Sequence, residues 1–171
     1  LALSANTTGT KNCAFGSMAL DANTTASENT GIGFAALTSN TTGTQNTGIG
    51  RETLSENTTG NYNTALGDTA LYYATTASHN TALGRASQFN TTTGANNTSV
   101  GYNSMVSNTT GYSNTAVGKE ALDSNTSGAE NVAIGLNALG VAQTSDNCTA
   151  VGYNALGANT ATAATAVGHQ A

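Results

Sequence analysis

The sequence is built on a 17-residue repeat, and this period restricts the fold more than any other feature. A glycine follows a short apolar group once in each unit. The step between successive marker glycines is 17 eight times, as from 16 to 33, and 16 once, from 152 to 168. A fixed period of this kind is typical of solenoid-like arrays, in which each unit stacks on the previous one. The marker glycines are Gly16, Gly33, Gly50, Gly67, Gly84, Gly101, Gly118, Gly135, Gly152 and Gly168.

The unit can be written as 17 columns, with Asn114 in column 1 of its clearest copy, residues 114–130. Column 4 is always apolar, column 5 is always Gly, column 3 is always small and column 9 is usually Leu. Asn recurs in columns 1 and 12, and Gly recurs in column 15. We expect these columns to be structural. They are represented by Asn114, Val117, Gly118, Leu122, Asn125, Gly128, Ile134 and Gly135.

The unit has no helical apolar pattern, while its Thr-Ala-Val segment suits a short strand. Side chains alternate across a strand, so columns 2 and 4 share one face and columns 3 and 5 share the other. Because the second face is almost bare backbone, we expect a neighbouring strand, coil or chain to approach it closely. The sequence therefore predicts an all-β fold, a parallel β-solenoid with one repeat unit per coil.

The recurrent Asn residues predict turns and ladders. Asn tolerates left-handed backbone and bonds its own turn, and Asn amides stacked in register can form a ladder along the axis. Gly in column 15 indicates a second turn. Three segments depart from the pattern, and each is either a tolerated loop change or a contact surface. They are residues 71–77, 87–90 and 140–144.

Composition excludes several classes of function. Charged residues make up 8% of the chain and the formal net charge is −5, which argues against binding to nucleic acid. The basic residues are few and look scattered: Lys11, Arg51, Arg85 and Lys119. No apolar run approaches the length of a membrane span, roughly 18 residues or more, so we expect no membrane insertion.

Residues 1–171 form a single array of about ten units. Leu3 falls in column 9 and Ala171 in column 8, so the chain starts and stops within a unit. We therefore expect it to be a fragment of a longer fibre.

No catalytic constellation, metal site or cofactor site is apparent. His79 and His169 are far apart in register, and we interpret them as surface turn residues. Cys13 and Cys148 lie eight units apart, roughly 38 Å at ~4.8 Å per strand. They are either small buried thiols or pair between chains.

Tyrosines in variable columns are the candidate surface contacts, because a flat ring suits a sugar face. They are Tyr62, Tyr72, Tyr73, Tyr102, Tyr112 and Tyr153.

Residues 130–135 (ENVAIG) and the NTAVGKEAL-type units resemble the head repeats of trimeric autotransporter adhesins. They resemble more closely the NTAVG-x-x-AL-x-x-NTTG arrays of phage tail fibres and bacterial surface fibres. The resemblance implies a left-handed parallel β-roll with two short strands per coil and three chains around one axis. It also implies attachment to a host cell or surface, an extracellular location on a virion tail or bacterial surface, and a cell-surface glycan or protein receptor.

Energetics also favour association. One unit buries only about two large apolar side chains, and the entropy lost on ordering its backbone exceeds this gain. We expect the chains to associate along the bare small-residue face. A three-sided hexapeptide β-helix ranks second as a fold, because it needs a longer coil with three aliphatic corners, whereas this unit offers one clear corner of the Ile-Gly-x-x-Ala type.

Two other functions remain open. An ice-binding β-solenoid would use flat ranks of Thr, although the Thr pairs here lie in turns and alternate with Asn. An acyltransferase-type β-helix enzyme would need a poised His and the full hexapeptide pattern. We expect the chain not to be an enzyme.

Overall fold

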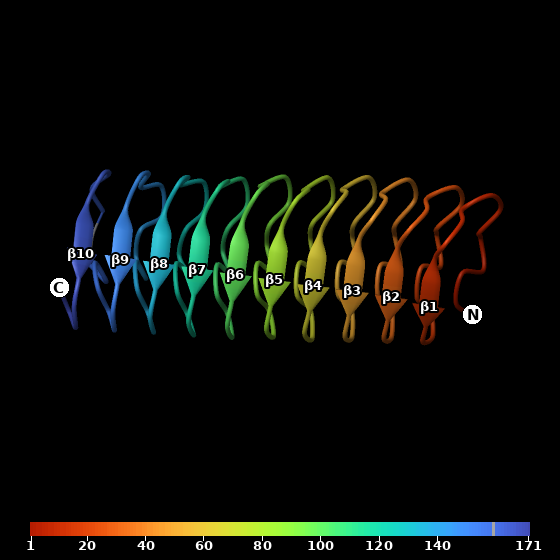
Figure 1. Cartoon of the computed structure of the whole chain (residues 1–171), viewed down its shortest axis with the longest axis horizontal. Coiled ribbons are helices and arrows are strands. Elements are labelled where there is room, and N and C mark those ends of the chain that lie inside the picture. Colours follow the sequence, from red (N-terminus) through yellow and green to blue (C-terminus); the bar gives the residue numbers. More distant parts are fainter. Residues whose placement is uncertain (159) are drawn as a thin grey trace.

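The computed structural model describes residues 1–158 and 160–171 as one elongated β-solenoid with its termini at opposite ends (Figure 1). Successive strands start one sequence period apart except for the last pair, and the predicted all-β parallel solenoid is confirmed. The described residues contain ten strands in a single sheet, in chain order. They are β1 (Cys13–Phe15), β2 (Thr30–Ile32), β3 (Thr47–Ile49), β4 (Thr64–Leu66), β5 (Thr81–Leu83), β6 (Thr98–Val100), β7 (Thr115–Val117), β8 (Val132–Ile134), β9 (Thr149–Val151) and β10 (Thr165–Val167).

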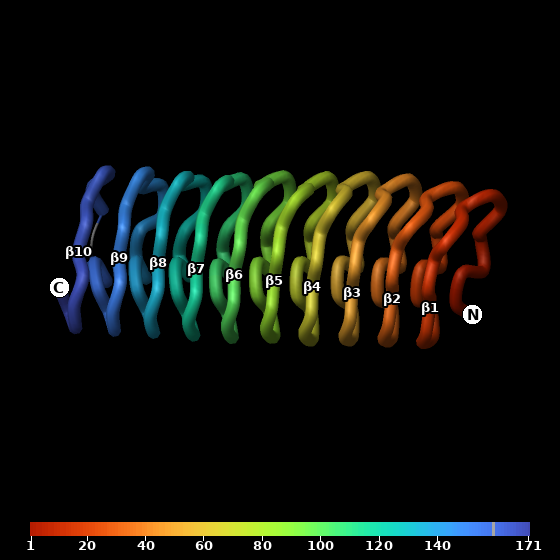
Figure 2. Tube along the Cα trace, in the orientation of Figure 1, coloured from red at the N-terminus to blue at the C-terminus, as the bar shows by residue number. Residues whose placement is uncertain are grey.

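The strands pair in parallel with every column in register. Thr115 lies opposite Val132, and Val117 lies opposite Ile134. At the C-terminal end, Thr165 pairs with Thr149 although the last unit is one residue shorter than the others. The strands form one wall, and the rest of each coil returns behind it (Figure 2). The shortened last unit is therefore absorbed outside the sheet.

Each described coil has one strand, so the expectation of two strands per coil is wrong. Columns 6–11 form a turn segment in place of the second strand. Glu120 (column 7, φ 55°) and Leu122 (column 9, φ 53°) both adopt left-handed backbone. Their N–H groups still reach neighbouring coils, since Leu122 donates to the carbonyl oxygen of Ala138 at 2.9 Å. The coils are thus hydrogen-bonded to each other without extended geometry on this side.

The small residues of column 3 face the interior of their own chain. Ala116 and Ala133 are fully buried in one core cluster with Leu122. A Cβ added at Gly31 would lie 3.2 Å from Cγ of Leu20. The small-residue face is therefore filled by the Leu column, and the expectation that chains associate along it is wrong.

Column 5 requires Gly for two reasons. Gly118 has φ +135°, a conformation that side chains rarely adopt. A Cβ there would also lie 2.5 Å from the carbonyl oxygen of Gly135, and one at Gly135 would lie 2.4 Å from that of Gly152. The predicted close approach is confirmed, and the approaching group is the next coil.

The two Asn columns form the predicted ladders inside the solenoid. The N–H of Asn131 donates to Oδ1 of Asn114 at 2.9 Å, and Nδ2 of Asn125 donates to Oδ1 of Asn108 at 2.8 Å. Nδ2 of Asn114 and Nδ2 of Asn125 both donate to the carbonyl oxygen of Gly128, at 2.8 and 3.1 Å. Each regular coil is therefore closed by two amides that meet at the column 15 carbonyl.

The backbone reason given for these columns is wrong. Besides columns 5, 7 and 9, positive φ occurs in column 17, as at Glu130 (59°), and not at Asn114, Asn125 or Gly128. Asn is used here for its side-chain hydrogen bonds. Gly128 is used for space, because a Cβ there would lie 2.3 Å from the carbonyl oxygen of Ser145.

Candidate interaction surfaces

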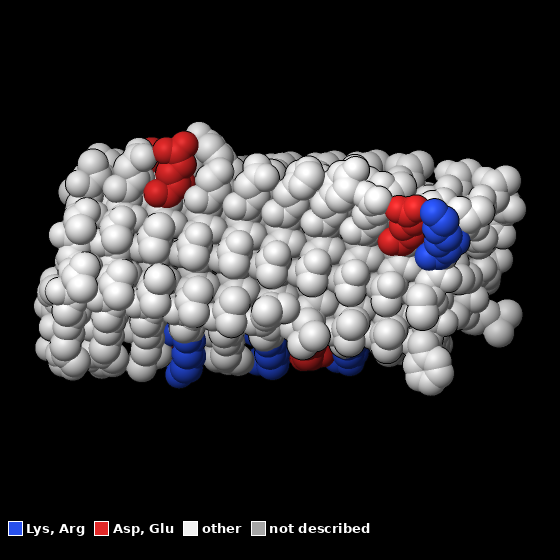
Figure 3. Space-filling view, viewed as in Figure 1, with Lys and Arg blue, Asp and Glu red and all other residues white. Residues whose placement is uncertain are grey.

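The first candidate surface consists of the side chains of columns 2 and 4 on β1–β10, called here the outer sheet face. These side chains point away from the core. Leu66 is 49% exposed and Ile134 39% exposed, while Val117 is half-buried. The sequence places no charged residue in columns 1–5 of any unit. In Figure 3 the charged side chains accordingly lie along the two long edges, and the face between them is uncharged.

Thr residues form a regular rank on this face. Eight of the ten strands begin with Thr, and the exceptions are Cys13 in β1 and Val132 in β8. From β2 to β7 the rank is unbroken, and each Thr lies opposite the next in the parallel register. The sequence already shows this rank, because the column 2 Thr residues recur at a spacing of one period, separately from the Thr pairs of the turns.

The second candidate surface is the turn edge, formed by columns 6, 7, 10 and 11. Arg51, Arg85 and Lys119 all occupy column 6, two coils apart from each other. Figure 3 shows basic side chains along the lower edge of the molecule. Asp68 lies between Arg51 and Arg85, since its carboxylate pairs with both. The description of the basic residues as scattered is therefore wrong for three of the four. Their spacing is twice the period and could have been found from the column numbering.

Lys11 lies apart from this row, in column 17. Its ammonium group contacts Oε1 of Glu28 at 2.9 Å, and Gln45 donates to the other carboxylate oxygen at 2.7 Å. The hydrogen bonds from Lys11 and Gln45 lower the pKa of Glu28.

The six candidate tyrosines do not form one site. Tyr72 and Tyr73 lie together at the turn edge with Phe89. Tyr102 lies under the guanidinium of Arg85, whose Cζ is 5.5 Å from the Tyr102 ring centroid.

The other three tyrosines lie apart from this group. Tyr62 stacks on His79, Tyr153 stacks on His169, and Tyr112 is 51% exposed. Both His side chains are exposed, in agreement with their interpretation as surface turn residues.

The two cysteines differ in environment. Cys148 replaces a column 1 Asn and is fully buried, with its N–H donating to Oδ1 of Asn131 at 2.9 Å. Cys13 replaces a column 2 Thr and is exposed on the outer sheet face. The interpretation as buried thiols is confirmed for Cys148 and is wrong for Cys13.

Within residues 1–158 and 160–171 no group of three or more His, Cys, Asp or Glu side chains is placed to hold a metal ion. The same described residues include no helix long and apolar enough to cross a membrane. Comparison with protein-family models, curated proteins and solved structures found no match. The class that the fold defines is a single-sheet parallel β-solenoid.

Proposed function

We propose that this chain is a rigid segment of an extracellular homotrimeric fibre that serves attachment, either a phage tail fibre or a bacterial surface adhesin. In this fibre three left-handed β-rolls pack around one axis through their outer sheet faces. The observation that carries the proposal is the outer sheet face itself. It is uncharged over ten strands and places an apolar side chain on each coil, such as Val117 and Ile134.

The character of this face supports association. Soluble monomers rarely expose a large contiguous apolar patch, and such patches mark interaction sites. The face also contains no charged residue that association would have to desolvate. Self-association would bury column 4 and leave both charged edges in water. We assign no catalytic role to the chain.

Charge placed on the outer sheet face tests the proposal. We expect Ile49→Lys combined with Val117→Lys to convert a trimer to a monomer in sedimentation velocity, because buried unpaired ammonium groups are strongly unfavourable. The matched control is Thr59→Lys combined with Thr110→Lys, at exposed positions of column 14. Circular dichroism should show the same β signal for both variants. A trimer that persists in the first variant would contradict the proposed packing.

Cys13 provides a second test of the proposed packing through the outer sheet faces. It lies on the outer sheet face, so three copies would bring their thiols near the common axis. We expect oxidation to produce disulfide-linked dimers in the native chain and none in Cys13→Ser. If the chain is a monomer with its outer sheet face exposed, no such dimers should form under dilute conditions.

The Thr rank supports a second candidate, an ice-binding β-solenoid. Thr residues at strand spacing beside a rank of aliphatic residues offer a regular surface of hydroxyl and methyl groups on β2–β7. This function needs the outer sheet face exposed, whereas the fibre needs it buried. Thermal hysteresis of a monomeric chain, lost in Thr64→Lys and Thr98→Lys, would favour ice binding over the fibre.

A further inference from the structure

Three aromatic side chains meet at the turn edge of two successive coils. The ring centroids of Tyr72 and Tyr73 are 4.7 Å apart, those of Tyr72 and Phe89 are 5.3 Å apart, and those of Tyr73 and Phe89 are 5.2 Å apart. Tyr73 is 43% exposed, and the other two are half-buried. Most other units place small or polar residues in columns 10 and 11. The solenoid therefore does not need these rings for its own stability.

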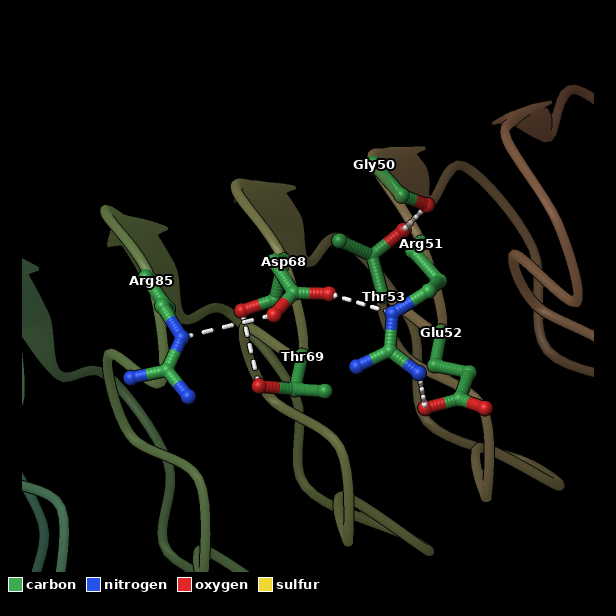
Figure 4. A network of polar contacts seen from close by, with 7 residues as sticks. All are labelled: Gly50, Arg51, Glu52, Thr53, Asp68, Thr69 and Arg85. Atoms are coloured by element: carbon green, nitrogen blue, oxygen red, sulfur yellow. Dashed lines mark hydrogen bonds and ion pairs between the residues drawn. The ribbon is translucent and has the colours of Figure 1, made fainter.

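An ion network crosses the column 6 positions of three coils that include these two. Nε of Arg51 lies 2.7 Å from Oδ1 of Asp68, and Nε of Arg85 lies 3.4 Å from Oδ2 of the same carboxylate (Figure 4). Nη1 of Arg51 also contacts Oε2 of Glu52 at 2.8 Å. The two guanidinium charges are therefore balanced by two carboxylates.

This network is also dispensable for the fold. Its ion pairs are solvent-exposed and of a kind that contributes little to stability. Other units carry uncharged residues in column 6, such as Ser17, Phe34 and Leu136. Because Asp68 holds two guanidinium groups at fixed positions, the network presents a pre-arranged set of hydrogen-bond donors and acceptors to solvent.

The aromatic cluster and the ion network are neighbours. Asp68 and Tyr72 belong to the same coil and flank a turn in which the N–H of Ala70 donates to the carbonyl oxygen of Gly67 at 3.4 Å. Asp68, Tyr72 and Tyr73 all lie in the turn segment of columns 6–11 of this coil, so the carboxylate and the two tyrosines share one end of the coil.

We propose that these six residues form a binding patch for a neutral saccharide, called here the edge patch: Arg51, Asp68, Tyr72, Tyr73, Arg85 and Phe89. The apolar face of a pyranose ring would stack on the exposed ring of Tyr73, which Tyr72 and Phe89 support. Its hydroxyl groups would donate to the Asp68 carboxylate and accept from the guanidinium of Arg85. Apolar contact with a few placed polar groups is the usual composition of a ligand site. Glu52, which pairs with Arg51 beside the patch, balances the remaining positive charge, and balanced charge favours an uncharged ligand. The inference rests on the attachment role proposed above and names its ligand class.

Saturation-transfer difference NMR with neutral oligosaccharides tests the patch. The probes are fragments of mannan, galactan and dextran, with a sialylated trisaccharide as the charged comparison. We expect contact with a neutral probe and an affinity about tenfold lower in Tyr73→Ala, because exposed aromatic anchors dominate such contacts. Asp68→Asn should weaken the same probe. The matched control is Tyr112→Ala, an exposed Tyr outside the patch.

The outcomes separate this inference from the fibre proposal. Binding of none of the neutral probes, or equal loss in Tyr73→Ala and Tyr112→Ala, would overturn the edge patch. Binding of the sialylated probe alone would overturn the neutral ligand class. Light scattering on the same samples reports the trimer independently, so a trimer without saccharide binding refutes the patch and leaves the fibre proposal standing.

Discussion

The regular coils and the coils around residues 71–91 have the same backbone but different interiors. In the regular coils Leu37 or Leu122 fills column 9, and Asn40 or Asn125 fills column 12. In the second region, Gln88 occupies column 9 and Ala74 occupies column 12. Strand pairing is unaffected, since β5 remains in register with β4 and β6. The coil-to-coil backbone bonds therefore set the register, and the columns only have to be compatible with it.

The core of the second region is polar around Gln88. Gln88 is fully buried, and its Nε2 donates to the carbonyl oxygen of Thr81 and to Oγ of Ser99, both at 3.0 Å. Ser87 and Ser99 share a hydroxyl hydrogen bond beside it. In the described part of the chain, Oε1 of Gln88 is one of three buried side-chain atoms with no hydrogen-bond partner. Gln88 with Ser87 and Ser99 thus takes the place of the usual column 9 Leu, and one polar atom of this group has no hydrogen-bond partner.

The Asn ladder of column 12 is interrupted in the same region and again at residue 142. Oδ1 of Asn57 has no partner because the next column 12 residue is Ala74, and Oδ1 of Asn125 has none because the next is Ala142. These are two of the three segments whose sequence departs from the repeat. Each interruption leaves a buried acceptor unsatisfied, and such an atom typically costs about 1–3 kcal/mol.

The largest effect should come from moving the polar core into a regular coil. We expect Leu122→Gln to lower the free energy of unfolding by about 3–5 kcal/mol, because it removes a buried Leu and introduces an unsatisfied amide. Urea unfolding followed by circular dichroism measures this change. The triple variant Ala121→Ser, Leu122→Gln, Ala133→Ser copies Ser87, Gln88 and Ser99 and should recover part of the loss. A triple variant less stable than Leu122→Gln would show that the serines do not cooperate with the amide.

A break in the continuous ladder should have an intermediate effect. We expect Asn40→Ala to destabilise the chain by about 1–3 kcal/mol, because it leaves Oδ1 of Asn23 without its donor. Thr42→Ala changes an exposed residue of the same turn and serves as the control, with an expected change within about 0.5 kcal/mol. Equal urea midpoints for the two variants would show that the ladder does not contribute to stability.

Completing the interrupted ladder should have the smallest effect, with the opposite sign. We expect Ala74→Asn to stabilise the chain by about 1 kcal/mol, because its Nδ2 can donate to Oδ1 of Asn57. Ala77 supplies the column 15 carbonyl for this new side chain, as Ala26 does for Asn23 at 3.0 Å. Thermal unfolding of Ala74→Asn beside Thr76→Asn, a change at an exposed position of the same turn, measures the gain. A lower melting temperature for Ala74→Asn would mean that the turn cannot accommodate the amide.

The sequence predicted the features that depend on backbone proximity. The coil length, an obligatory small group at Gly118 and stacked amides at Asn114 and Asn125 all follow from the repeat. It did not show which strand face is buried. Alternation separates Thr115 and Val117 from Ala116, but the larger residues normally indicate the core, and here they lie outside.

The missing second strand had no signal in the sequence. Left-handed backbone is usually marked by Gly or Asn, yet here Leu122 adopts it within a network of bonds to the next coil. The edge patch was partly predictable. Tyr72 and Tyr73 are candidate contact residues in the sequence, and the separation of Arg51 and Arg85 equals two periods, which places both at the same edge.

The most direct test of the central claim, that the outer sheet face joins three chains, is the mass of the unmodified chain in solution. Static light scattering should give three times the 16.9 kDa mass of the chain, with a β-rich circular dichroism spectrum. A β-rich species with the mass of one chain that stays monomeric at high concentration would contradict the account. The outer sheet face would then be exposed to solvent, and the ice-binding alternative would take precedence.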